Sequence, residues 1–133
     1  MGTILAIDFG AVRVGLAITD TDQKFALALK TIPAEPRNEC FEAIRRVTND
    51  EHVERVLLGL PLSLDGNEGP QATAVRAFGN ELTNNLGLPL EFVDERFSTK
   101  SSAMAARMKG MKSPDAEAAR LLLETWIEKN LNR

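Results

Sequence analysis

The first third of the chain carries three short apolar runs separated by turn-forming residues. The runs cover residues 3–7, which end at Asp8, residues 14–19, and residues 25–32, which stop before Pro33. Short apolar runs that contain β-branched residues and end at turn residues are typical of strands. Because the connections between them are short, we expect the three strands to form an antiparallel meander.

After residue 33 the apolar positions recur at intervals of three and four residues, which is the spacing of helices. This spacing predicts helices over about 38–49 and 75–86, and a last helix that begins at Ser113-Pro114. Two short apolar runs between them, residues 55–58 and 90–93, read as buried strands. Right-handed crossovers would set these two strands parallel to a strand already in the sheet.

One more helix is predicted between the last strand and the last helix. Ser98 or Thr99 can cap it, and Gly110 can stop it after Lys109. If the helix over about 98–109 and the last helix are written together as one α, the order of elements is βββαβαβα. We therefore expect an α/β fold, a mixed sheet of about five strands with helices on both faces, the first three strands antiparallel and the later ones parallel.

The composition is that of a globular protein and limits the possible functions. The 133 residues fit a single domain over residues 1–133, with 44% hydrophobic and 26% charged residues. Met1–Asp8 does not resemble a signal peptide, and no apolar run is long enough to span a bilayer, so we expect a cytoplasmic protein without a membrane partner. The single cysteine, Cys40, excludes an internal disulfide. A net charge of -3 means that any nucleic-acid binding must rest on local basic residues.

Acidic residues stand where predicted strands and helices end. Asp8 follows the first strand, Asp94-Glu95 follow the last strand, and Asp115 lies in the first turn of the last helix. Ligands of open α/β sheets gather outside the carboxyl ends of parallel strands. Carboxylates that converge there suit Mg²⁺ or Mn²⁺, and such a cluster is the usual platform for two-metal cleavage of phosphodiesters.

Each of these acids also has a purely structural interpretation. Asp8 precedes a glycine turn, where aspartate is common. Asp94-Glu95-Arg96 read as an exposed loop with a weak ion pair, and Asp115 favourably opposes a helix dipole. Only the joint placement of the acids indicates a metal site, and the sequence leaves open whether Asp94 or Glu95 is the metal ligand.

Basic residues near the acids are candidates for phosphate contacts. If they share the acid-bearing edge, the contacts would come from Arg13, Arg96, Lys100 and Lys112. The alternative is that these side chains are solvated surface residues. The loop from Gly59 to Gln71 either offers backbone N–H groups to a phosphate or only turns the chain.

Four blocks of the sequence resemble a known family. The first is Asp-x-Gly-x-x-Arg-x-Gly at residues 8–15, and the others lie at residues 59–71, 93–99 and 115–123. Together and in this order they resemble the YqgF/RuvX family. Two departures stand out: Ala11-Val12 replace a usual Thr-Lys, and the segment before Asp115 is shorter than the lysine-rich stretch of many relatives.

The resemblance implies a ribonuclease H-like fold and a metal-dependent nuclease. Its implied acids are Asp8, Glu95 or its neighbour Asp94, and Asp115, with Mg²⁺ or Mn²⁺ as cofactor. The implied partner is structured RNA, with 5′-end processing of pre-16S rRNA in ribosome biogenesis as the function, or branched DNA, with Holliday junction resolution as the function. Either a monomer or a homodimer is compatible with these activities.

Two functions of other classes stay open at this point. Asp-x-Gly near an N-terminal strand also opens the sugar kinase and actin-like ATPase superfamily, although those proteins need two such domains to enclose a nucleotide. A non-catalytic module that binds ribosomal precursor RNA is the second alternative, and the shortened basic segment and the acidic pI favour it.

Overall fold

The computed structural model describes residues 2–63, 65–95 and 114–131 of the chain. The helix predicted over 98–109 lies outside these residues, as do Arg96, Lys100 and Lys112. Along the chain the elements are β1 (Thr3–Phe9), β2 (Arg13–Thr19), β3 (Ala26–Pro33), α1 (Arg37–Asp50), β4 (Val53–Leu60), α2 (Pro70–Leu86), β5 (Leu90–Asp94) and α4 (Pro114–Asn130).

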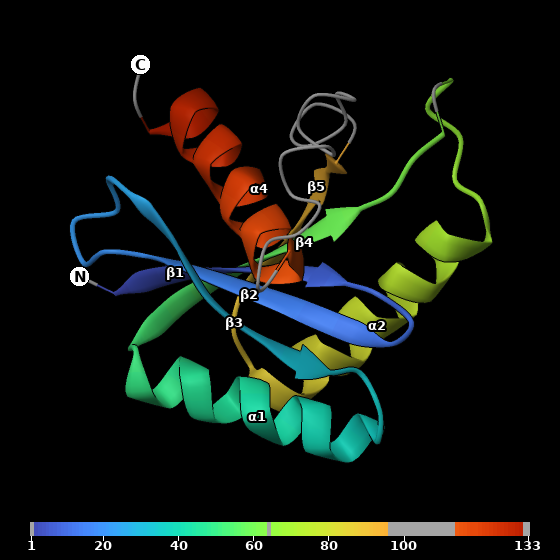
Figure 1. The fold of residues 1–133 in the computed structure, drawn as a ribbon, viewed down its shortest axis with the longest axis horizontal. Coiled ribbons are helices and arrows are strands. Elements are labelled where there is room, and N and C mark those ends of the chain that lie inside the picture. The colour runs from blue at the N-terminus through green and yellow to red at the C-terminus, as the bar shows by residue number, and fades with distance from the viewer. Residues whose placement is uncertain (1, 64, 96–113, 132–133) are drawn as a thin grey trace.

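These strands form one five-stranded mixed sheet with the order β3-β2-β1-β4-β5 (Figure 1). β1 pairs antiparallel with β2, and β2 pairs antiparallel with β3. β4 pairs parallel with β1, and β5 pairs parallel with β4. The predicted meander and the predicted parallel crossovers are therefore both confirmed, and the carboxyl ends of β1, β4 and β5 meet at one edge of the sheet.

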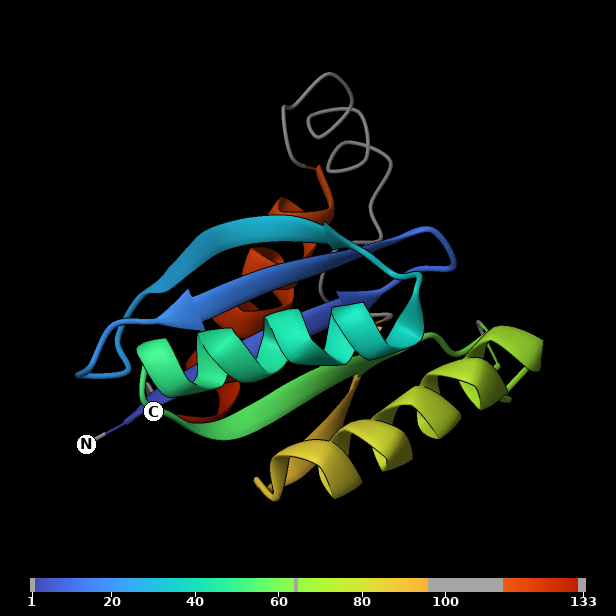
Figure 2. The same ribbon diagram turned by 90° about the horizontal axis from the view of Figure 1, so that it is seen from below.

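Helices cover both faces of the sheet, as predicted. Figure 2 shows α1 and α2 together on one face, and α4 crosses the other. Each face has its own hydrophobic cluster. The alternation of β1 divides its side chains between them: Leu5 and Ile7 join the cluster beneath α1 and α2, whereas Ile4 and Ala6 join the cluster beneath α4.

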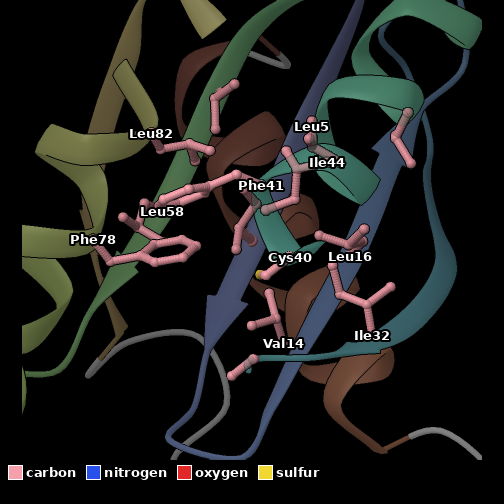
Figure 3. Close-up of a cluster of buried hydrophobic side chains, with 14 of the residues drawn as sticks. Leu5, Val14, Leu16, Ile32, Cys40, Phe41, Ile44, Leu58, Phe78 and Leu82 are labelled. Atoms are coloured by element: carbon pink, nitrogen blue, oxygen red, sulfur yellow. The ribbon is translucent and has the colours of Figure 1, made fainter. Parts of the chain in front are cut away.

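The larger cluster lies beneath α1 and α2 (Figure 3). Phe78 of α2 is fully buried in it, and Cys40 of α1 is 2% exposed. Trp126 of α4 is buried in the other cluster. Phe78, Cys40 and Trp126 are thus core residues, which agrees with their helical spacing in the sequence.

Helix α2 begins earlier than its apolar spacing predicts. The spacing indicates a start near Val75, but the helix starts at Pro70, which occupies its first turn. Proline is suited to this position because its N–H would be unpaired there and its φ is already helical. Of the residues between Pro70 and Val75 only Ala72 is buried, so the first turn gives little apolar signal. Among the described residues, no helix has both the length and the apolar character that a bilayer span requires.

Candidate active site

Asp8 lies near the carboxyl end of β1, and its side chain faces α4. The next residue, Phe9, stacks on Phe78 of α2 with ring centroids 4.2 Å apart, so Phe9 points to the opposite face. Because strand residues alternate, Asp8 continues the row of Ile4 and Ala6. The candidate site is therefore on the α4 face of the sheet.

Asp115 is brought to this edge by the contact between α4 and β2. In the sheet Asp8 pairs with Gly15 of β2. A Cβ built on Gly15 would clash with the carbonyl group of Asp115 and stand 2.7 Å from the nitrogen of Ala116. The first turn of α4 thus lies directly on the glycine that is paired with Asp8, and a larger residue would keep it away.

Glu95 approaches from the other side of β1. A Cβ built on Gly59 of β4 would stand 2.5 Å from Oε1 of Glu95, so the Glu95 side chain lies across this glycine. Gly59 follows Leu57 by two positions, and Leu57 belongs to the cluster beneath α4. The Glu95 carboxylate is therefore on the same face as Asp8.

Asp94 takes the opposite direction. Phe92, two residues earlier in β5, packs against the cluster beneath α1 and α2, whereas Val93 packs against the cluster beneath α4. By strand alternation Asp94 shares the side of Phe92. Of the two neighbouring acids, Glu95 is the one that the fold places beside Asp8.

The carboxylate of Asp115 is paired with Arg13. Nε of Arg13 donates a hydrogen bond of 2.9 Å to Oδ2 of Asp115, and the two side chains are 63% and 28% exposed. Within the described residues, no three Asp, Glu, His or Cys side chains are arranged closely enough to hold a metal ion. The acids share one edge and one face, but the cation next to Asp115 is a guanidinium.

The donor set nevertheless suits a hard divalent cation. Asp8, Glu95 and Asp115 offer carboxylate oxygens, the ligands that Mg²⁺ and Mn²⁺ prefer. Two of these acids lie against glycines of the strands on either side of Asp8. The backbone of Asp115 lies against Gly15 of β2, and the side chain of Glu95 lies against Gly59 of β4. The Asp115 carboxylate, which is held by Arg13, would have to leave this partner before it could share a cation with the other acids.

The loop after β4 is held by its own hydrogen bonds. Asn67 donates from its side chain to Asp65, and its backbone N–H lies 3.2 Å from the Ser63 hydroxyl. The hydrogen bond from Ser63 and those from Asn67 lower the pKa of Asp65. Arg76 donates two hydrogen bonds of 2.7 and 2.6 Å to Glu68, which lowers the pKa of Glu68. The Glu68 carboxylate is thus paired with Arg76.

Sequence reasoning missed one support of the site. Arg37 of α1 lies 5.3 Å from the ring centroids of both Phe9 and Phe78, and it pairs with Glu35 and Glu81. The contacts with Arg37 and Phe78 hold Phe9 in place, and Phe9 directly follows Asp8. The available signal was a basic residue at the start of an amphipathic helix, which does not by itself indicate an aromatic partner.

A family model described as "RuvX: Holliday junction resolvase" matches residues 2–129 of the chain. The chain belongs to the RuvX family. The resemblance of the four sequence blocks is therefore confirmed over nearly the whole chain.

Curated relatives are similar over almost their full length. A protein of Anaeromyxobacter sp. (strain K) is 37% identical over 131 residues, which covers 94% of this chain and 96% of the relative. A protein of Maridesulfovibrio salexigens is 38% identical over 130 residues, which covers 93% and 96%. Both are named "Putative pre-16S rRNA nuclease".

Solved structures share the fold at low sequence identity. RuvC of T. thermophilus in complex with a Holliday junction substrate matches with a TM-score of 0.62 at 14% identity, covering 97% of this chain and 96% of RuvC. The fowlpox virus Holliday junction resolvase matches with a TM-score of 0.56 at 14% identity, covering 97% and 99%. The expected ribonuclease H-like fold is thus confirmed for this RuvX-family chain.

Proposed function

We propose that this chain is a metal-dependent endonuclease that cleaves phosphodiester bonds in structured RNA, and that its substrate is the 5′ end of pre-16S rRNA. The observation that carries the proposal is the close contact of two acids with glycines in the strands beside Asp8. Gly15 admits Asp115 from one side and Gly59 admits Glu95 from the other. Membership of the RuvX family and the names of the curated relatives support the reaction and the substrate.

In this proposal Asp8, Glu95 and Asp115 hold Mg²⁺ or Mn²⁺. A divalent cation bound there supplies Lewis-acid stabilisation of the charge that develops on the phosphate oxygens. The protein's part is to hold acids from three separate segments at one edge. Arg13, with its exposed guanidinium, binds a backbone phosphate. Arg96, Lys100 and Lys112 are proposed as further phosphate contacts, and the reaction is proposed to occur in the cytoplasm.

The central test is Asp8→Asn, assayed on a pre-16S rRNA fragment with Mg²⁺ and with Mn²⁺. The substitution keeps the size of the side chain and removes its charge, so cleavage should be lost while the circular dichroism spectrum is unchanged. Asp22→Asn, an exposed acid in the turn between β2 and β3, is the matched control and should cleave like the original protein. Metal-dependent cleavage that survives in Asp8→Asn would refute the assignment.

Holliday junction resolution is the second candidate, favoured by the description of the family model. The same preparation should be given a four-way DNA junction. Symmetric cleavage of the junction together with an intact RNA fragment would establish this alternative in place of the first.

Non-catalytic RNA binding is the third candidate, and the ion pair of Asp115 with Arg13 favours it. It requires that the original protein bind the RNA fragment but leave it intact with either metal. The kinase-like alternative loses its support, because the RuvX match accounts for the Asp-x-Gly block as part of a chain-long similarity.

A further inference from the structure

The Arg13–Asp115 pair joins two residues that the proposed function assigns to different ligands. Asp115 is assigned to the divalent cation and Arg13 to a phosphate, yet here Arg13 Nε lies 2.9 Å from Asp115 Oδ2. Arg13 therefore occupies the carboxylate that the cation would need. In the same way, Asp115 occupies the guanidinium that the phosphate would need.

The backbones on both sides of this pair are fixed. The N–H of Gly10 donates to the carbonyl of Arg13 at 2.9 Å and closes the turn between β1 and β2. Arg13 also pairs with Pro33 of β3. Asp115 is held by the contact of its backbone with Gly15. The pair can therefore open by rotation of the two side chains, without movement of a strand or helix.

The chemistry of both groups favours such an exchange. A guanidinium matches the oxygens of a phosphate as well as those of a carboxylate, and it can bind either with two hydrogen bonds. With Arg13 63% exposed, the ion pair is screened by water and weak. Nucleic acid carries closely spaced negative phosphates, so one of them can compete with Asp115 for Arg13. Breaking the exposed ion pair costs little free energy.

We propose that Arg13 is a positioning residue that exchanges between Asp115 and a backbone phosphate, so that nucleic-acid binding releases Asp115 to the cation. This inference rests on the proposed function. Without nucleic acid, the guanidinium satisfies Asp115 and competes with the divalent cation. With nucleic acid, Arg13 moves to the phosphate and the Asp115 carboxylate becomes available. Linkage then requires that nucleic acid and cation strengthen each other's binding.

The first experiment measures Mn²⁺ affinity by titration calorimetry in the absence of nucleic acid. Arg13→Met should bind Mn²⁺ about twofold to fivefold more tightly than the original protein, the range expected from the loss of a competing exposed ion pair. Arg76→Met is the matched control, because it removes an arginine that is paired with a different exposed carboxylate, Glu68. It should leave the Mn²⁺ affinity unchanged.

The second experiment uses no metal and therefore no cleavage. Binding of a fluorescent short RNA duplex is measured in EDTA for the original protein, Asp115→Asn, Arg13→Met and the double variant. Asp115→Asn frees Arg13 and removes a negative charge, so it should tighten RNA binding. The gain should be about twofold to fivefold larger with Arg13 present than in the Arg13→Met background, because Arg13 is the partner of Asp115 among the described residues.

The outcomes separate this inference from the proposed function. An original protein that binds no Mn²⁺ by calorimetry refutes the metal site, whereas the RNA cycle still tests the exchange. Equal gains in the two backgrounds of that cycle overturn the exchange, and so does Mn²⁺ binding that Arg13→Met leaves unchanged. If Arg13→Met leaves Mn²⁺ binding unchanged but the original protein cleaves RNA, the proposed function remains valid. Arg13 would then only form a surface ion pair with Asp115.

Discussion

Gly15 of β2 lies against the backbone of Asp115, so that a Cβ on this glycine would clash with the carbonyl group of Asp115. The neighbouring atoms are backbone on both sides, and neither can rotate away. Gly15→Ala should therefore push the first turn of α4 off the sheet. We expect a loss at the upper end of the about 1–3 kcal/mol that overpacking costs, measured as the free energy of unfolding in urea.

Gly69→Ala is the matched control for that substitution. Among the described residues, no atom lies within 4 Å of a Cβ built on Gly69, which is the N-cap of α2 and has φ -100. Its unfolding free energy should change by less than about 1 kcal/mol. Equal stability of Gly15→Ala and Gly69→Ala would show that α4 does not rest on Gly15.

Gly59→Ala should separate stability from activity. The three nearest atoms that its methyl group would meet belong to the Glu95 side chain, which can turn aside by changing its rotamer. The unfolding free energy should therefore change by no more than about 1 kcal/mol. The displaced carboxylate should weaken Mn²⁺ binding in calorimetry and slow RNA cleavage. Unchanged Mn²⁺ affinity would mean that Glu95 does not need its contact with Gly59 in order to bind the metal ion.

The neighbouring acids Asp94 and Glu95 provide a test of the strand alternation. Glu95→Gln removes a charge on the face of Asp8 and should slow cleavage at least about 100-fold, equivalent to several kcal/mol of lost electrostatic stabilisation. Asp94→Asn removes a charge that alternation places on the opposite face, and it should stay within about threefold of the original rate. Rate constants are to be compared at saturating metal, and the reverse order of effects would reassign the ligand to Asp94.

The strands and their directions could be predicted because the decisive signals are local. Apolar runs with short connections determine the meander, and the helices after β3 and β4 determine the parallel pairing. Asp8 could be placed at the sheet edge for the same reason, since it directly follows an apolar run.

The arrangement of the site depended on contacts between distant segments, which the pattern does not contain. Glu95 could be separated from Asp94 only when the side of β5 that meets α4 was known. The pairing of Arg13 with Asp115 joins residues 102 positions apart, and both residue types are ordinary at their local positions. A glycine within an apolar strand, such as Gly15 or Gly59, was the one local sign of a close approach.

Cys40 provides a chemical probe of the cluster beneath α1 and α2. The side chain is 2% exposed, and burial raises the pKa of its thiol. Because the thiolate is the reactive form, iodoacetamide should modify the folded protein slowly at neutral pH and the urea-unfolded protein quickly. Since the chain has one cysteine, the mass added in an intact-protein spectrum reports on Cys40 alone.

The rate of that modification should follow the opening of the core. Phe78, fully buried, lies in the same cluster as Cys40 and stacks on Phe9. Phe78→Ala removes a ring whose loss costs about 3–5 kcal/mol in a typical core, so the cluster opens more often and Cys40 should be alkylated faster. Arg45→Ala serves as the control and should leave the rate nearly unchanged, because Arg45 is a half-buried residue of α1 that forms an ion pair with the exposed Glu42. Rapid alkylation of the folded original protein would contradict the burial of the thiol, and equal rates in Phe78→Ala and Arg45→Ala would contradict its dependence on this cluster.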